Sequence, residues 1–145
     1  MMRCSLYIRS GVAYIPVDAK TEAGFHMNIE PVEVVPVSDS QAFARAIKQT
    51  IARGNPMIPT PTRATGFPKP VIPKYAKLKS WRAFEQDASY WTFEKREGAY
   101  EIEQWQKSPE RGWDPDPERR ITLPDGTPQD EAIKQLVTIV QSQEK

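Results

Sequence analysis

Short sequence landmarks recur along this chain at a nearly constant spacing. Ala-Ile-Lys-Gln occurs at residues 46–49 and again at 132–135, 86 residues apart (132 − 46). Gly11 and Gly98 are 87 apart (98 − 11), and each separates two segments rich in β-branched and aromatic residues. Three further pairs keep an offset of 86 to 88 residues: Ala13 and Ala99, Glu22 and Glu110, and Pro36 and Pro124. A constant offset indicates that one structural unit occurs twice, at 5–53 and 89–142.

Each copy predicts three strands followed by one helix. Runs rich in β-branched and aromatic residues, and the apolar runs that follow them, predict strands at 5–10, 12–17 and 30–37 in the first copy, and at 90–95, 99–105 and 118–124 in the second. One such unit cannot bury both faces of a three-stranded sheet. We therefore expect an α+β fold in which two pseudo-repeated ββ-β-α units share a core or join into one sheet.

Polar turn signals precede the helix of each copy. Residues 38–40 open the first helix, and Gly54 supplies its C-terminal stop. In the second copy, Thr127 followed by Pro128 predicts an N-cap with proline at the first helical position. In both Ala-Ile-Lys-Gln segments, alanine and isoleucine are expected to pack on the sheet while lysine and glutamine face water.

The chain divides into a first copy at 1–53, a connection at 54–88 and a second copy at 89–145, together one compact unit. The connection holds six prolines, which favour an extended and largely unpaired backbone. Apolar residues between these prolines indicate a strap held against the body, with a loose linker as the alternative. A short helix capped by Ser80, with Trp81 on its apolar side, is expected at the end.

Charge is distributed unevenly although the whole chain carries only +1. Residues 1–53 hold five acids and six bases, a net of +1, and residues 54–80 hold five bases without an acid, a net of +5. Residues 81–145 hold fourteen acids and nine bases, a net of −5. A basic strap and an acidic second copy therefore cancel in the total.

Residues for enzyme chemistry are sparse. His26 is the single histidine and Cys4 the single cysteine, and the seven glycines are scattered. These counts disfavour a catalytic triad, a zinc site and a phosphate-binding loop. We expect no catalysis, no metal and no cofactor. A lone cysteine and the lack of an 18-residue apolar run favour a cytoplasmic protein without a membrane span.

The second copy indicates a surface for a protein partner. Alternation places Trp91, Phe93, Tyr100 and Ile102 inside and their neighbours outside. The expected partner-binding residues are aromatic or acidic: Tyr90, Glu94, Glu101, Glu103, Trp105, Trp113, Asp114 and Asp116. Rigid aromatic side chains amid carboxylates are typical anchors for a basic partner. A one-residue change of register would instead bury Trp105 under the strap or the other copy.

Residues 80–105, the Gly112-Trp113 loop and residues 123–137 resemble small bacterial immunity proteins of contact-dependent growth inhibition, a class of polymorphic toxin systems. The resemblance implies a cytoplasmic, non-catalytic protein that binds and neutralises a cognate, basic toxin domain, possibly a nuclease, and is a monomer or weak homo-oligomer. It does not account for the basic strap.

Two other functions stay open at this point. The bases of the strap, with Phe67 and Tyr75, favour a nucleic-acid-binding accessory protein, although a pI near 7.8 argues against it. The abundant surface carboxylates would suit a small hydrolase.

Overall fold

A computed structural model describes residues 2–66 and 68–144 as a mixed α+β fold, which confirms the predicted class. Its strands are β1 (Met2–Arg9), β2 (Val12–Thr21), β3 (His26–Pro36), β4 (Met57–Ile58), β5 (Ala88–Arg96), β6 (Ala99–Gln104), β7 (Gln106–Lys107), β8 (Trp113–Asp114) and β9 (Arg120–Thr122). Its helices are α1 (Ser40–Arg53), α2 (Ile72–Tyr75), α3 (Trp81–Glu85), the 3-10 turn η1 (Pro117–Arg119) and α4 (Gln129–Gln143).

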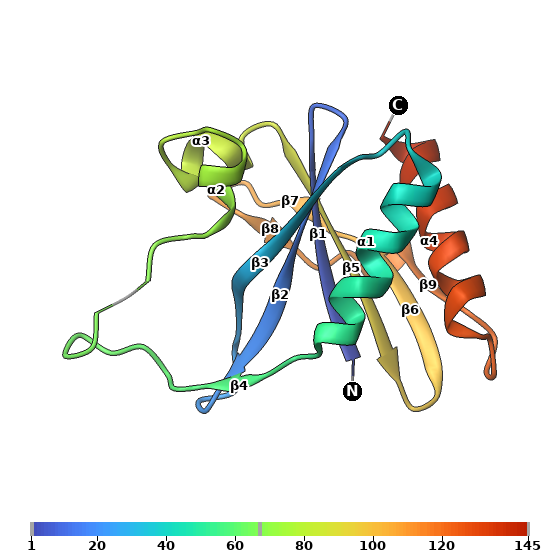
Figure 1. The fold of residues 1–145 in the computed structure, drawn as a ribbon, viewed down its shortest axis with the longest axis horizontal. Helices are drawn as coiled ribbons and strands as arrows, with labels where there is room; N and C mark the ends of the chain where they lie inside the picture. The colour runs from blue at the N-terminus through green and yellow to red at the C-terminus, as the bar shows by residue number, and fades with distance from the viewer. Residues whose placement is uncertain (1, 67, 145) are drawn as a thin grey trace.

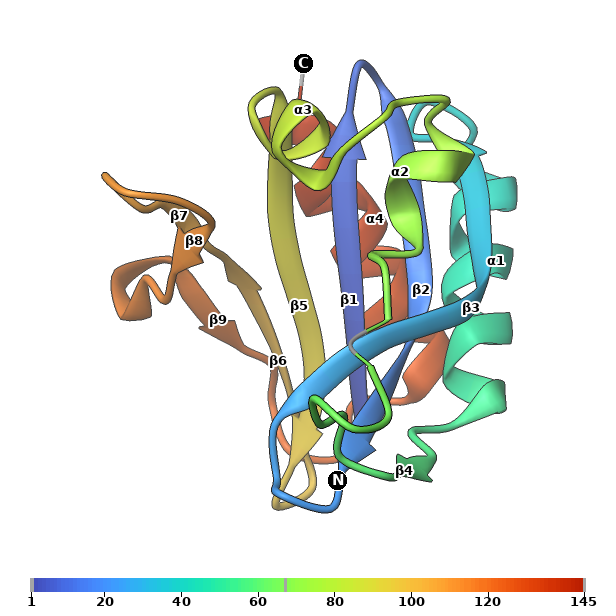
Figure 2. The same ribbon diagram turned by 90° about the vertical axis from the view of Figure 1, so that its left-hand side faces the viewer.

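One large sheet runs in the order β3-β2-β1-β5-β6-β9, with β4 added to β2, and a separate β7-β8 ribbon flares away from it (Figures 1 and 2). The β1-β2 and β5-β6 hairpins both close through two residues with positive φ, which suits the right-handed twist of paired strands. These are Ser10 (52°) and Gly11 (75°) in the first, and Glu97 (50°) and Gly98 (84°) in the second.

The two halves of the sheet meet where β1 pairs antiparallel with β5. At the centre of this pairing Ser5 lies opposite Thr92, and these residues are 87 apart (92 − 5). Both halves contain three strands of this sheet followed by a long helix. That the halves arose by duplication stays a prediction.

Helices α1 and α4 lie side by side over one face of the sheet and form the main core with it (Figure 1). The Ala-Ile pairs at 46–47 and 132–133 are buried, whereas Lys48 is exposed and its Nζ lies 3.1 Å from a carboxylate oxygen of Asp130. The expected inward packing of the Ala-Ile pairs is confirmed, while Gln135 is half-buried.

The helix ends follow local chemistry, with one correction. Asp39 caps α1 through its Oδ1, which accepts the backbone N–H three residues later at 3.0 Å, and Gly54 (φ 78°) ends the helix. The expected cap at Thr127 is wrong, because Pro128 is the N-cap of α4. The Thr127 hydroxyl instead donates to the Pro124 carbonyl oxygen at 2.6 Å and closes the preceding turn.

The opposite face of the sheet carries the strap, defined here as residues 54–80. Two points hold it to the body: β4, where Met57 pairs with Lys20 of β2, and Ile72, which is 1% exposed. Between these points it passes in front of β3 (Figure 2). The strap is therefore attached at both ends, contrary to the loose linker, and it is paired at β4. Phe67 lies outside the described residues.

The helix predicted to follow the strap is present as α3. Ser80 caps it, with Oγ accepting the Ala83 N–H at 3.1 Å, and Phe84 is fully buried below Trp81. Tyr7 and Tyr14 from the sheet join these rings in a second apolar cluster. None of the helices in the described ranges has the length and apolar character needed to cross a membrane.

Candidate functional site

Four of the predicted partner-binding residues, Tyr90, Glu94, Glu101 and Glu103, lie on the face of β5 and β6 that points away from α1 and α4. The other four lie in the 105–119 segment that follows β6. The inward positions are confirmed: Trp91, Phe93, Tyr100 and Ile102 are at most 3% exposed. Their neighbours do point to the other face, but several of them do not reach solvent. Thr92 is 3% exposed, and Glu94 and Glu103 are each 7% exposed. Side-chain alternation determines only which face of the sheet a residue points to. In this protein other segments of the chain also cover the second face, so residues that point there can still be buried.

Glu94 is held by arginines from both halves of the protein. Arg3 on β1 donates to its Oε1 through Nη1, and Arg96 donates to its Oε2 through Nε at 2.7 Å. The expectation that Glu94 faces solvent is wrong, because these charge-assisted hydrogen bonds compensate a largely buried carboxylate.

Glu103 is likewise satisfied within the chain. Its Oε1 accepts from Nε of Arg120 on β9 at 3.0 Å, and its Oε2 accepts from the backbone N–H of Asp116 at 2.8 Å. Asp116 is itself half-buried, with Oδ2 3.5 Å from Nε of Arg119. The Glu103 side chain thus ties the 105–119 segment and β9 to β6, contrary to its expected exposure, whereas the Asp116 carboxylate pairs within that segment.

Glu101 differs from these carboxylates. It lies opposite Glu94 in the β5-β6 pairing and is half-buried, yet within the described ranges it makes no side-chain hydrogen bond or ion pair. It lines a recess of about 190 Å³ together with Glu94, Glu103, Trp105 and three arginines. The other two glutamates there accept hydrogen bonds from the arginines, whereas Glu101 acts on Arg120 through its charge alone.

Trp105 is neither free in solvent nor sealed inside. Its indole is half-buried, and Nε1 donates to the Thr92 hydroxyl oxygen at 2.9 Å. The rest of the ring separates the Glu101 recess from a second hollow of about 290 Å³, which is bounded by Trp113, Lys107 and Arg119. An indole anchored by its nitrogen presents a rigid apolar edge at little entropic cost.

Tyr90 points to the outer face as predicted, but it is half-buried there because an aromatic cluster packs around it. Its ring stacks on Tyr7 with centroids 4.8 Å apart, and its hydroxyl oxygen accepts from Nη2 of Arg3 at 3.0 Å. Burial raises the pKa of the Tyr90 phenol. Trp113 packs on both tyrosines, with centroids 5.8 Å from Tyr7 and 5.5 Å from Tyr90.

The outer side of Trp113 is partly accessible. Lys107 places its ammonium 5.2 Å from the centre of one ring and donates to the backbone oxygen of Glu85. Trp113 is half-buried, and the next residue, Asp114, is exposed. Of the eight predicted residues only Glu94 and Glu103 are buried, and the other six are half-buried or exposed. Tyr90 and Asp116 are held by partners within the chain, which leaves Glu101, Trp105, Trp113 and Asp114 as the candidates for outside contacts.

Sequence reasoning missed the buried polar network beneath this face. Asp18 on β2 is 2% exposed, accepts the Ser5 hydroxyl at 2.6 Å and lies 3.5 Å from Nε of Arg3. Burial raises the pKa of the Asp18 carboxyl to about 6, and the Ser5 hydrogen bond and the Arg3 charge oppose that shift. The sequence does carry one sign of this network. Asp18 stands between the apolar residues Val17 and Ala19 of a strand, where a carboxylate is uncommon.

The two residues weighed for catalysis do not line the Glu101 recess. Cys4 is buried in the main core, where burial raises the pKa of its thiol. His26 begins β3, and partial burial, followed by the charge of Arg3, lowers its pKa. Within the described part of the chain, no three His, Cys, Asp or Glu side chains gather as metal ligands.

No protein-family model matches this sequence, and no curated protein does. Solved structures do match over nearly the whole chain. A protein of unknown function from Neisseria meningitidis superposes with a TM-score of 0.68 at 11% identity, over 98% of this chain and 94% of that one. A chain of the CdiA-CT/CdiI toxin and immunity complex from Yersinia pseudotuberculosis gives a TM-score of 0.64 at 9% identity, over 97% and 95%.

These matches define the class of fold. The chain has a fold similar to that of a chain from a toxin and immunity complex. The resemblance drawn from residues 80–137 is confirmed at the level of fold.

Proposed function

We propose that this protein is an immunity protein, which binds a bacterial toxin domain and blocks its active site or substrate groove without chemistry of its own. The observation that carries the proposal is the match along 97% of this chain to a chain of a toxin and immunity complex. The accessible indoles and carboxylates beside β6 and β8 supply a surface for that role.

We assign the contacts to the accessible edge of the face. Trp105 and Trp113 act as the anchors, because half-buried tryptophans bury much apolar area and lose little side-chain entropy on binding. Glu101 and Asp114 provide carboxylates to lysines or arginines of the toxin. Such charges raise the association rate and favour a basic partner.

The other four predicted residues support this surface from inside. Tyr90 backs both indoles in the aromatic cluster, and Glu94, Glu103 and Asp116 hold the strands and the 105–119 segment in place through arginines. Their loss should change stability more than partner specificity. A rigid platform is what keeps the two indoles preorganised for the toxin.

The test is protection of a bacterium that expresses the toxin domain encoded in the gene immediately upstream of this one. Co-expression of the intact chain should restore growth and retain the toxin domain in a pull-down. A Glu101→Gln/Trp105→Ala double variant should weaken binding by about tenfold or more, whereas Glu131→Gln, on the exposed side of α4, should bind like the unmodified protein.

Two results would contradict the proposal. Absence of binding and of growth protection by the intact chain would remove the immunity role. Unchanged affinity of the double variant would keep the role and reject this surface. Retention of RNA or DNA on a filter at low salt, lost when the strap lysines are replaced, would instead favour the nucleic-acid alternative.

A further inference from the structure

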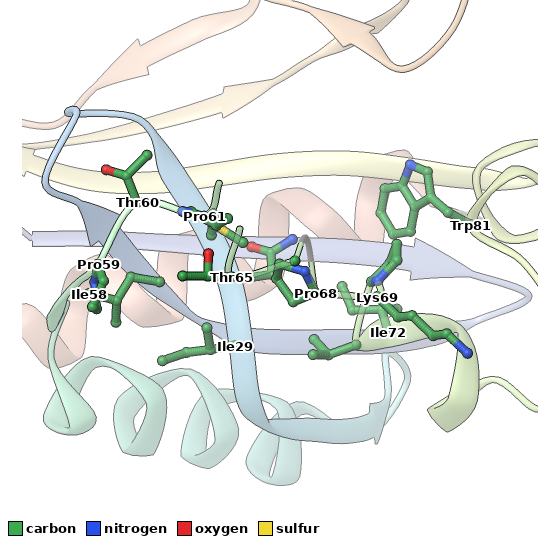
Figure 3. A pocket seen from close by; sticks show the side chains of 15 residues that line it. Ile29, Ile58, Pro59, Thr60, Pro61, Thr65, Pro68, Lys69, Ile72 and Trp81 are labelled. Carbon is green, nitrogen blue, oxygen red and sulfur yellow. The ribbon is translucent and has the colours of Figure 1, made fainter. Parts of the chain in front are cut away.

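A groove lies between β3 and the strap. Its volume is about 680 Å³, which lies in the range of small-molecule sites. Ile58 and Pro59 stand at one end, and Trp81 and Ile72 at the other (Figure 3). The groove is therefore elongated along the strap, and it is separate from the recesses beside Trp105.

We propose that this groove binds a small amphipathic organic anion with an extended hydrocarbon chain, of the medium-chain acyl carboxylate class. The site lies beyond the toxin-binding surface proposed above and does not depend on it. The apolar walls of the groove, the polar side chains that border it and the positive charge of the strap each favour such a ligand.

The walls of the groove are apolar and stiff. Ile29 from β3 and Ile58 and Ile72 from the two attached ends of the strap supply branched aliphatic side chains. Four prolines of the strap also line it: Pro59, Pro61, Pro68 and Pro70. Because proline fixes the backbone angle φ, the strap wall loses little entropy when a ligand fills the groove. A hydrocarbon chain that lies along such walls is stabilised by the apolar area it buries.

The polar groups at the groove favour a carboxylate head. Lys69 borders it, is exposed and makes no ion pair within residues 2–66 and 68–144, whereas Lys74 nearby is already paired with Glu30. Asn28 also lines the groove, and its Nδ2 donates to the Tyr7 hydroxyl at 2.7 Å, which fixes its amide. The strap contains no acid, so its potential over the groove is positive.

The experiment is calorimetric titration of the intact protein with sodium decanoate, with sodium octanoate and with the uncharged analogue 1-decanol. Decanoate should bind saturably with one molecule per chain. Octanoate should bind about tenfold more weakly, because two methylene groups fewer are buried.

Variants locate the binding in the groove. Thr65→Trp, at an exposed lining position, should fill the groove and abolish binding while the protein stays folded. Ile58→Asp, at the far end, provides an independent block. Lys69→Gln should weaken decanoate about two- to fivefold and leave 1-decanol unchanged. The matched control is Lys77→Gln, an exposed strap lysine outside the lining.

Several results would overturn the assignment. They are no saturable binding of decanoate to the intact protein, unchanged affinity in both Thr65→Trp and Ile58→Asp, and equal weakening by the Lys69 and Lys77 variants. Toxin protection is measured in a separate assay. A lack of decanoate binding would therefore leave the proposed immunity function intact, and a lack of toxin protection would leave the ligand site intact.

Discussion

Replacing Asp18 with asparagine is the substitution whose effect follows most directly from the buried network. In the folded protein burial raises the pKa of this carboxyl from 3.8 to about 6, a difference of roughly 2.2 units (6 − 3.8). At 1.36 kcal/mol per unit, the charged form costs the folded state about 3 kcal/mol relative to the protonated form. This cost arises because Ser5 and Arg3 only partly compensate the charge, and Glu94 adds a like charge nearby.

The sign of the pH dependence follows from the raised value. Below the unfolded pKa near 4 the group is protonated in both states, and its full stabilising contribution is present. As the pH rises through about 6, the folded state gives up its proton and that contribution is lost. Asp18→Asn keeps the size of the side chain and removes the titration. The variant should therefore gain stability over the unmodified protein between pH 5 and pH 7.5, by up to about 2 kcal/mol once the lost Arg3 contact is allowed for.

Urea unfolding followed by tryptophan fluorescence at pH 5, 6, 7 and 7.5 measures this difference. Asp114→Asn, at an exposed position, is the control and should shift the free energy of unfolding by less than about 0.5 kcal/mol at each pH. Titration of His26 is common to all three proteins and cancels in the comparison. A difference between Asp18→Asn and the unmodified protein that does not vary with pH would refute the reasoning.

Three further substitutions or treatments test the fold. Ile47→Ala, in the fully buried core, should lower the free energy of unfolding by about 2–5 kcal/mol in urea titrations, whereas Ile121→Ala, at 41% exposure, should cost less than about 1 kcal/mol. Gly98→Ala should destabilise by about 1 kcal/mol in the same assay, because φ is 84° there and a methyl group meets no neighbour within 4 Å, so the loss reports backbone strain alone. The Cys4 thiol should react with a thiol reagent only in urea, because it is fully buried and its pKa is raised; rapid modification of the native protein would contradict its placement.

Local features of this protein were predictable from the sequence. The inward positions of Trp91 and Phe93, the two-residue turns at Gly11 and Gly98, and the cap at Ser80 depend on residues close together in the chain. Side-chain alternation and turn chemistry act over a few residues, so a sequence pattern predicts them directly. The N-cap of α4 is Pro128 and not the predicted Thr127. A difference of one residue is usual when a helix end is assigned.

The environment of the candidate site could not be predicted in this way. Glu94 was expected to face solvent because its strand position points away from the core. Its partner Arg3 is 91 residues away in sequence, and only the β1-β5 pairing brings the two together. The same holds for Tyr90, whose exposure depends on where Tyr7 and Trp113 lie.

The sequence by itself determined the order of the six main strands and the two long helices, the inward side of β5 and β6 and the uneven distribution of charge. Tertiary structure alone decided which carboxylates are neutralised, which indoles stay accessible and that a groove lies beneath the strap. The physical reason is that the local backbone decides which side of the sheet a side chain points to. Its burial and its ion pairs depend on distant segments that come into contact only on folding.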